Sequence, residues 1–161
     1  MPNRRPLVVG LISDTHGLVR PGVHTALAGV SLILHAGDVC GDDVLDELAM
    51  IAPVEAVSGN MDDAADPRLA PELLRDVNGV RIHVSHGHEL GEPHPDALAA
   101  RYDADVIVYG HTHRALIARI GDRLVVNPGA AGPRRFNLLP SVARLTIANG
   151  TAEVAIVPLD Q

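Results

Sequence analysis

The stretch LVVGLISDTHG, residues 7–17, joins a short apolar run to Asp14 and His16. A β-branched run that is stopped by polar residues predicts a strand over 7–12 followed by a loop. In α/β proteins, the loops at the carboxyl ends of strands carry the side chains that bind ligands. The two polar residues are therefore candidates for a functional site, provided that other strands bring similar side chains to the same place.

Eight further apolar runs follow, bounded by Gly, Asn, Asp or Pro, and we predict that they are strands. They cover residues 31–34, 54–57, 80–84, 105–108, 116–120, 124–126, 142–147 and 154–157. Between the early runs, the segments PGVHTALAG, DDVLDELAMI and PDALAARYD have the pattern of amphipathic helices. Strands that alternate with helices predict parallel pairing first, and the turn signals Gly121-Asp122 and Asn149-Gly150 predict antiparallel hairpins last. The sequence thus predicts a mixed α/β sandwich.

Composition limits the class of protein. A length of 161 residues favours one domain over 1–161. The formal net charge of -7 argues against non-specific binding to nucleic acid or to a membrane surface, because both need basic patches. No apolar run reaches the roughly 18 residues of a membrane span, and one cysteine, Cys40, cannot form an intrachain disulfide. We therefore expect a cytoplasmic protein that binds neither nucleic acid nor membrane.

Polar side chains follow five successive predicted strands. They are Asp14 and His16, then Asp38, then Asn60, then His86 and His88, and finally His111 and His113. Each group alone could be a helix cap, a turn or a satisfied core histidine. Because ligands bind at the carboxyl ends of strands, we expect all five groups to meet at one edge of one sheet. Oxygen and imidazole ligands without thiolates favour Mn, Fe, Zn, Ni or Co, and their number favours two ions that share a carboxylate.

In kind and order, these groups resemble the motifs of the calcineurin-like metallophosphoesterases. The matching blocks are Asp14-x-His16, Gly37-Asp38, Gly59-Asn60, His86-Gly-His88 and Gly110-His111-Thr-His113. The short chain and the segment VVNPGAAGPRR, which ends at Arg135, are similar to the compact bacterial and archaeal phosphodiesterase subfamily. The resemblance implies a four-layer α/β/β/α sandwich with mixed sheets, hydrolysis of a phosphoric ester, and a homodimer or higher oligomer.

The resemblance also implies how the ligands divide between two divalent metal ions. Asp14, His16, Asp38 and His113 would hold one ion; Asp38, Asn60, His86 and His111 would hold the other, with Asp38 bridging. Manganese is the first expectation, with Ni, Fe, Co or Zn as alternatives. A hydroxide that bridges the ions would attack the phosphorus, so we expect Asp38, Asn60 and His16 to be catalytic. His88 would either orient a ligand or contact the substrate.

Met61 departs from the wider superfamily, in which many members have a histidine proton donor directly after the asparagine. A thioether cannot donate a proton, so we expect a preference for esters whose leaving groups depart unaided. The compact subfamily often has a small or apolar residue at this place and keeps the following acid, which is Asp62 here. The sequence leaves the roles of Met61 and Asp62 open, as it does a contact of Arg134 or Arg135 with phosphate.

The remaining titratable residues receive ordinary structural interpretations. We expect His35 to be a satisfied core histidine and His24, His83 and His94 to be structural. Cys40 has no evident base beside it in the sequence, so we expect an unreactive thiol.

Two functions compete at this point. The first is a metal-dependent phosphodiesterase that acts on a small phosphoester. The second is a non-catalytic scaffold for protein contacts, because a eukaryotic retromer subunit uses this fold in that way and Met61 removes the proton donor. All seven ligand positions are filled, which favours the enzyme. A nuclease is the least favoured function because the chain is short and acidic. The sequence does not determine the physiological substrate.

Overall fold

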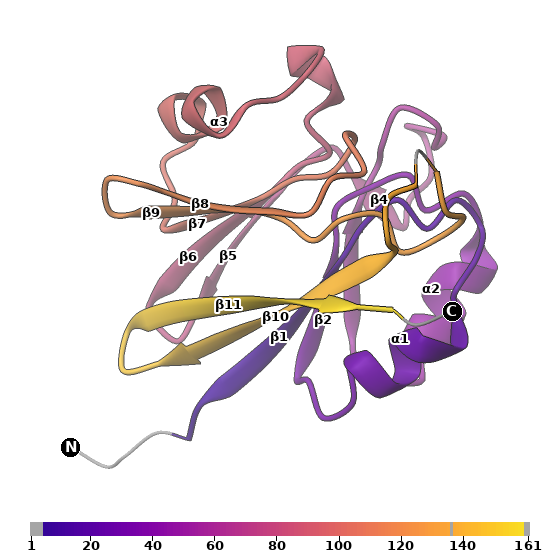
Figure 1. Ribbon diagram of the computed structural model, residues 1–161, viewed down its shortest axis with the longest axis horizontal. Helices are drawn as coiled ribbons and strands as arrows, with labels where there is room; N and C mark the ends of the chain where they lie inside the picture. Colours follow the sequence, from indigo (N-terminus) through magenta and orange to yellow (C-terminus); the bar gives the residue numbers. More distant parts are fainter. Residues whose placement is uncertain (1–4, 136, 160–161) are drawn as a thin grey trace.

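The computed structural model describes residues 5–135 and 137–159 as two β-sheets packed face to face, with helices on both outer faces (Figure 1). The first sheet contains β1 (Leu7–Ile12), β2 (Leu32–His35), β3 (Val54–Val57), β4 (Leu69–Ala70), β10 (Ser141–Ala148) and β11 (Thr151–Pro158). The second contains β5 (Leu73–Val77), β6 (Val80–Val84), β7 (Val106–Val108), β8 (Leu116–Ile120) and β9 (Arg123–Asn127). Their spatial orders are β11-β10-β1-β2-β3-β4 and β5-β6-β7-β9-β8.

The helices of the described residues are short and sit where the sequence predicts them. They are α1 (Pro21–Ala26), α2 (Asp42–Ala49) and α3 (Pro95–Arg101), together with a 3-10 turn, η1 (His88–Leu90). Helices α1 and α2 cover the first sheet and α3 covers the second (Figure 1), so the predicted α/β/β/α layering is confirmed. Within the described part of the chain, no helix is long and apolar enough to cross a membrane.

Strand pairing follows the predicted change of direction along the chain. Strands β1 to β4 pair in parallel, as do β6, β7 and β9. Antiparallel pairing joins β8 to β9 and β10 to β11, as the turn signals predict. Asn149 and Gly150 have φ angles of 56° and 76°, which is the left-handed backbone that a two-residue hairpin needs. Strand β10 also pairs with β1, which places the last hairpin in the same sheet as the first strand.

Strands β4 and β5 fall outside the predicted set. Strand β5 has the sequence LLRDV, and its three central residues are exposed, so it shows no apolar run. It joins β6 through Asn78 and Gly79, with φ angles of 49° and 87°. This is the same turn dipeptide as at 149–150. For such a polar edge strand, the turn dipeptide is therefore a better sequence signal than the hydrophobicity of the strand itself.

Three aliphatic clusters fill the spaces between the layers, and among the described residues Tyr109 is their only fully buried aromatic member. Alternate residues of one strand face different clusters. Val9 and Leu11 pack between the sheets, whereas Ile12 packs beneath α1 and α2. Because both faces of β1 are covered, its run is almost continuously apolar.

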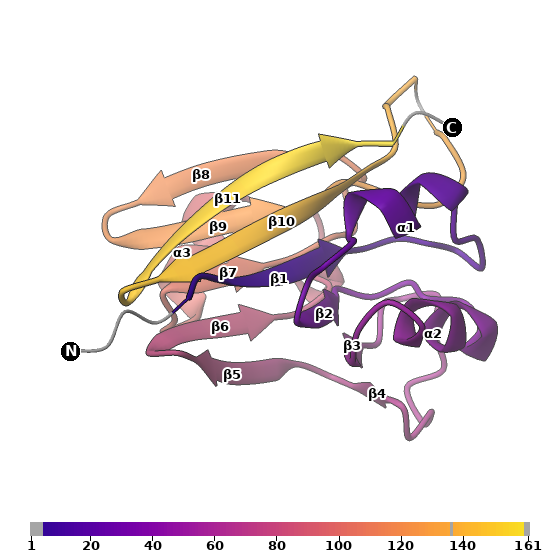
Figure 2. The same ribbon diagram turned by 90° about the horizontal axis from the view of Figure 1, so that it is seen from below.

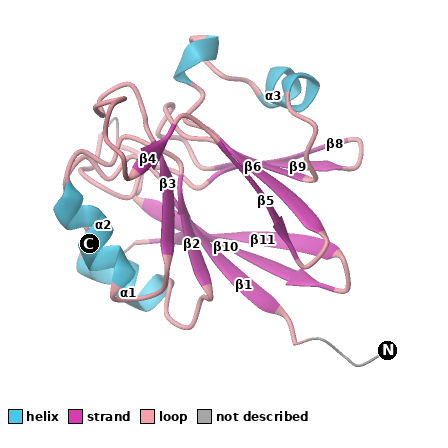
Figure 3. Cartoon of the chain, turned by 180° about the vertical axis from the view of Figure 1, so that it is seen from behind, coloured by secondary structure: helices cyan, strands magenta, loops and turns pink. Residues whose placement is uncertain are grey.

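The carboxyl ends of the central strands point to the same end of the sandwich. Figure 2 shows the arrowheads of β1 and β6 directed toward this end, and Figure 3 shows it from behind. Three of the five predicted groups follow β1, β2 and β3 in the first sheet, and two follow β6 and β7 in the second. The expectation of a single sheet edge is therefore wrong: the groups meet where the edges of two packed sheets come together.

Candidate metal centre

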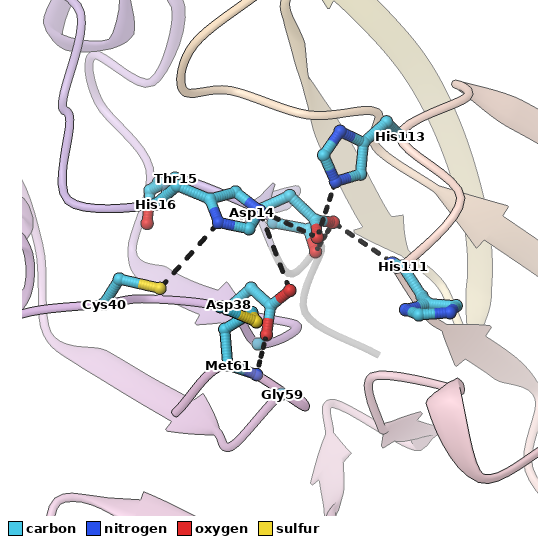
Figure 4. Close-up of polar contacts among 12 residues, drawn as sticks. Asp14, Thr15, His16, Asp38, Cys40, Gly59, Met61, His111 and His113 are labelled. Carbon is cyan, nitrogen blue, oxygen red and sulfur yellow. Dashed lines mark hydrogen bonds and ion pairs between the residues drawn. The ribbon is translucent and has the colours of Figure 1, made fainter. Parts of the chain in front are cut away.

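Asp14 lies at the centre of a cluster of imidazole rings from both sheets. Its Oδ1 atom is 3.4 Å from His113 Nε2, 3.7 Å from His16 Nε2 and 3.8 Å from His86 Nε2. The second carboxylate, Asp38, has its Oδ2 atom 3.3 Å from His86 Nε2 and 3.6 Å from His16 Nε2. Figure 4 shows Asp14, Asp38, His16 and His113 facing one another. These five predicted residues are thus brought together.

The spacing of these atoms suits a shared metal ion better than direct hydrogen bonding. Two ligands of one ion, each about 2.1 Å from it, lie roughly 3–3.5 Å apart, whereas a hydrogen bond from nitrogen to oxygen is about 2.9 Å long. Among the described residues, Asp14 Oδ1, His16 Nε2 and His86 Nε2 are buried and have no hydrogen-bond partner. Buried polar atoms are rarely left unpaired. The donor set therefore fits a metal cation.

Two groups of side chains are close enough to hold an ion. One contains Asp14, His16 and His113, and the other contains Asp14, Asp38 and His86. His111 lies outside both groups. His111 Nδ1 is instead 3.2 Å from Asn60 Oδ1, and the His111 ring centroid is 5.2 Å from that of His86. The structure thus places the predicted pair next to the second group but hydrogen-bonded to each other.

His86 is oriented by the backbone of the neighbouring sheet. Its Nδ1 atom lies 2.8 Å from the carbonyl oxygen of Ala36, so the ring donates from Nδ1 and turns Nε2 toward the carboxylates. Burial alone would lower the pKa of His86, but the nearby carboxylate of Asp38 and the charge of Asp14 outweigh it and raise the pKa. The ring is therefore fixed in the orientation that a metal ligand needs.

The two carboxylates stay ionised despite their burial. Burial opposes ionisation of Asp14, but the adjacent imidazoles of His113 and His16 hold its pKa far below the usual range. Ser13 Oγ also donates to Asp14 Oδ2 at 2.6 Å. For Asp38, burial is likewise outweighed, mainly by His86, and the pKa is lowered. Two negative charges are thus kept inside the cluster, which a cation would neutralise.

Several of these side chains are presented by strained backbone. Five of the seven predicted ligands have positive φ angles: Asp14 (54°), His16 (46°), Asp38 (55°), His111 (72°) and His113 (64°). Non-glycine residues seldom adopt this region, at a cost of about 1–2 kcal/mol each. Such strain concentrates where the surrounding structure holds a functional group in place. It is a signal of function that the sequence does not contain.

The glycines that precede Asn60 and His111 are needed for close packing. A Cβ atom on Gly59 would lie 2.1 Å from Asp38 Oδ1, and one on Gly110 would lie 2.1 Å from Ser13 Oγ and 2.7 Å from Asp14 Oδ2. Any side chain at these positions would displace a carboxylate. The Gly-Asn and Gly-His pairs thus permit the approach of two loops and are not simply turn signals.

Asp62, whose role the sequence leaves open, connects the loops that carry Asp38 and Asn60. Its carboxylate accepts backbone hydrogen bonds from Val39 (3.1 Å), Cys40 (2.8 Å) and Gly59 (2.9 Å). The Met61 N–H donates to Asp38 Oδ1 at 2.9 Å, while the Met61 side chain is 65% exposed (Figure 4). The backbone around Met61 therefore positions the carboxylate, while its side chain is largely exposed.

We predict that Asp62→Ala destabilises the fold by about 2–4 kcal/mol, because three backbone donors lose a charged acceptor. Chemical denaturation would measure the free energy of unfolding. Hydrogen exchange should become faster at the amides of Val39, Cys40 and Gly59. The control is Asp63→Ala, since that exposed carboxylate accepts one bond, from Ala65, and should cost about 0.5 kcal/mol. Equal effects of the two substitutions would contradict the role given to Asp62.

Most of the other histidines are placed as expected. His35 is fully buried and both ring nitrogens have partners: Nδ1 accepts from the Gly37 N–H and Nε2 lies 2.9 Å from Thr15 Oγ1. Burial lowers the pKa of His35 to about 4, so this ring is a neutral core residue, as predicted. His24 and His83 each pair with a glutamate at 2.7 Å.

The expectation that Cys40 has no base beside it is wrong, since Cys40 Sγ lies 3.8 Å from His16 Nδ1. Burial, followed by the charge of Asp62, nevertheless raises the pKa of this thiol to about 11, which agrees with low reactivity. Arg134 and Arg135 are exposed, and their contact with phosphate stays a prediction.

Asn127 is a supporting residue for the last block. Its side chain donates to the Gly110 carbonyl (3.2 Å) and to Thr112 Oγ1 (3.0 Å), and it accepts from the Gly129 N–H (2.9 Å). It thereby fixes the loop that carries His111 and His113. Ser13, whose hydroxyl donates to Asp14, carries no signal in the sequence beyond its place before Asp14.

The fold and the site define a class of protein: a two-sheet α/β sandwich with an Asp and His cluster where the sheets meet. A family model described as the calcineurin-like phosphoesterase superfamily domain matches residues 7–150. The chain therefore belongs to the calcineurin-like phosphoesterase superfamily, which confirms the resemblance. The members of this family are metal-dependent phosphoesterases, and the clusters around Asp14 are candidate metal ligands.

Individual relatives agree with this assignment. A probable metallophosphoesterase of Methanothermobacter thermautotrophicus is 36% identical over 150 residues, which cover 87% of this chain and 81% of its own. A phosphodiesterase of Methanocaldococcus jannaschii is 28% identical over 141 residues, covering 75% and 82%. The solved structure of vacuolar protein sorting 29 from Cryptosporidium parvum has a TM-score of 0.79 at 24% identity, covering 97% and 99%. This last likeness shows a shared fold.

Proposed function

We propose that the protein is a phosphodiesterase that uses two divalent metal ions, with manganese as the first candidate, to hydrolyse a small phosphoester. The observation that carries the proposal is the set of buried, unpaired ligand atoms around Asp14 and Asp38. When bound, two such ions supply a nucleophile derived from water at neutral pH and stabilise the charge that develops on the phosphoryl oxygens.

The chain's own residues would then have distinct tasks. Asp14, His16, Asp38 and His113 would hold one ion, and Asp38, Asn60, His86 and His111 the other, with Asp38 common to both. The short distances from Asp14 Oδ1 to both His16 and His113 support the first set, and the Asp38–His86 contact supports the second. Because His111 and Asn60 are now hydrogen-bonded to each other, they would exchange that bond for contacts with the ion.

His16 and Asn60 would also orient the substrate. His16 is in the rim of the cluster and Asn60 is exposed, so both reach the place where a phosphoryl group would approach. The amide of Asn60 adds no charge, which keeps the loaded site positive for an anionic ester although the chain as a whole is acidic.

The test is turnover of bis(p-nitrophenyl) phosphate by protein that elemental analysis shows to contain two ions per chain. The protein would be loaded in turn with Mn²⁺, Ni²⁺, Fe²⁺, Co²⁺ and Zn²⁺. We expect hydrolysis with at least one metal, greatest with Mn²⁺, and loss of activity on chelation. Absence of turnover in every loaded form would falsify the proposed activity. A panel of phosphomonoesters, phosphodiesters and cyclic nucleotides would then identify the substrate class.

A non-catalytic scaffold remains the second candidate, and the likeness to vacuolar protein sorting 29 is the observation that favours it. Because the sequence identity is only 24%, this likeness shows a shared fold and nothing more. The complete set of ligand positions favours the enzyme. Homo-oligomerisation and a cytoplasmic location stay predictions, which sedimentation analysis and cell fractionation would check.

A further inference from the structure

A cavity lies beside the loop that carries His86, and His86 itself is among the residues that line it. It has a volume of about 110 Å³ and is bounded by the loop after β6, the residues before β5 and the end of α3. Alternation along β6 explains its position. Val84 packs between the sheets, and His83 stacks on Tyr102 at the end of α3. By alternation, Ser85 lies on the cavity side. The ring of His86 lies on the opposite side, where it contacts Ala36 and Asp38.

The cavity contains buried groups that lack a partner. Ser85 is only 7% exposed, and both Ser85 Oγ and His88 Nδ1 are buried without a hydrogen bond to any other described residue. Both residues line the cavity. A serine hydroxyl can donate and accept, and an imidazole nitrogen can do either. Since buried polar groups are normally paired, these two atoms mark hydrogen-bonding capacity that a ligand would meet.

The charged residues of the wall restrict the chemistry of that ligand. Glu72 and Glu89 also line the cavity, Glu72 paired with His83 and Glu89 lying 3.8 Å from Arg101, so the wall offers carboxylate acceptors rather than a free cation for a second phosphate or a carboxylate. Arg101 is already engaged, because it lies 3.8 Å from Glu89 and donates to Tyr102 Oη at 3.1 Å. A ligand with hydroxyl groups can donate to the carboxylates and accept from Ser85, whereas an anion cannot.

The aromatic residue of the wall argues against a planar base. The Tyr102 ring is stacked on His83 with a centroid distance of 3.7 Å and an interplanar angle of 19°, and Arg101 lies 5.6 Å from its centroid. The ring is thus already covered, and nucleobases bind largely by stacking on free aromatic faces. A short, non-planar alcohol fits these limits.

We propose that this cavity is a subsite for a neutral, short polyol group, such as glyceryl, that is esterified to the phosphate bound at the metal centre. His88 connects the two places: it lines the cavity, and its ring centroid is 5.4 Å from that of His86 and 6.4 Å from that of His111. The inference rests on the proposed phosphodiesterase function and names the substrate class for it.

The first test compares two diesters with the same leaving group, p-nitrophenyl glyceryl phosphate and p-nitrophenyl propyl phosphate. The wild-type protein should prefer the glyceryl ester by about tenfold in kcat/KM, which corresponds to one well-placed hydrogen-bond network. Ser85→Val removes the hydroxyl and fills space, and should bring the ratio close to one. The milder Ser85→Ala should lower it part of the way. The control Ser31→Val alters an exposed serine at the start of β2 and should leave the ratio unchanged.

The second test needs no catalysis. Glycerol 1-phosphate added to protein loaded with diamagnetic Zn²⁺ should shift the amide resonances of Ser85, His88 and Glu89, whereas propyl phosphate should not, and Ser85→Val should remove the response. If neither diester is hydrolysed with any metal, the proposed function fails, but this titration still decides the subsite. Equal responses to the two phosphates, or a glyceryl preference that survives Ser85→Val in folded protein, would overturn the subsite.

Discussion

Replacing Asp38 with alanine is expected to lower kcat/KM for bis(p-nitrophenyl) phosphate by at least about 10³-fold, or about 4 kcal/mol of transition-state stabilisation. Asp38 is the carboxylate that both proposed ion sites share. Its Oδ2 atom approaches His86 and His16, and its Oδ1 atom accepts the Met61 N–H. Without it, the imidazoles have one negative partner fewer, so elemental analysis should find fewer than two ions per chain.

A control separates this effect from loss of the fold. Asp122→Ala alters an exposed carboxylate in the turn between β8 and β9 and should retain full activity and metal content. Asp38→Asn keeps the size of the side chain and should also be inactive, with a circular dichroism spectrum like that of the wild type. If Asp38→Ala keeps more than a tenth of the activity with two ions bound, the bridging role is wrong.

The second large effect concerns Met61→His. We expect it to speed the hydrolysis of diesters with poor leaving groups by about 10²-fold, because a positioned general acid supplies roughly 10²–10⁴-fold. Methionine leaves the departing oxygen unassisted, so wild-type rates should fall steeply as the pKa of the leaving phenol rises. The substitution is structurally mild: the Met61 side chain is mostly exposed, and the contact with Asp38 comes from the backbone.

The measurement is the slope of log kcat/KM against the pKa of the leaving group over a series of aryl phosphodiesters. Met61→His should flatten the slope and change the p-nitrophenyl ester little, because that group departs readily unaided. Met61→Gln is the matched control, since its amide donates a hydrogen bond but does not transfer a proton at neutral pH. An unchanged slope in Met61→His would show that position 61 does not face the leaving group. Equal flattening in Met61→Gln would show that a hydrogen bond, and not proton transfer, changes the slope.

Much of the fold follows from local signals in the sequence. The apolar runs predict β1, β2 and β3 within one or two residues, and Pro21 and Pro95 mark the first residues of α1 and α3. These elements are predictable because burial on both faces forces an unbroken apolar run, and because a proline is tolerated at the start of a helix. The missed strand β5 lies at the edge of its sheet with its three central residues exposed, so its hydrophobic run disappears although its Asn78-Gly79 turn is present.

The sequence by itself determined which residue types stand after which strands, and hence the kind of chemistry. Their arrangement was decided only by the tertiary structure. It split the ligands between two sheets, paired His111 with Asn60, and placed Asp62 as the acceptor for three backbone donors. It also set the left-handed backbone at Asp14 and Asp38. The physical reason is the sequence range of the interactions. Strand periodicity and turn preference depend on residues that are neighbours in the chain, whereas the conformation of the loops and the distances between ligand atoms depend on contacts between distant segments.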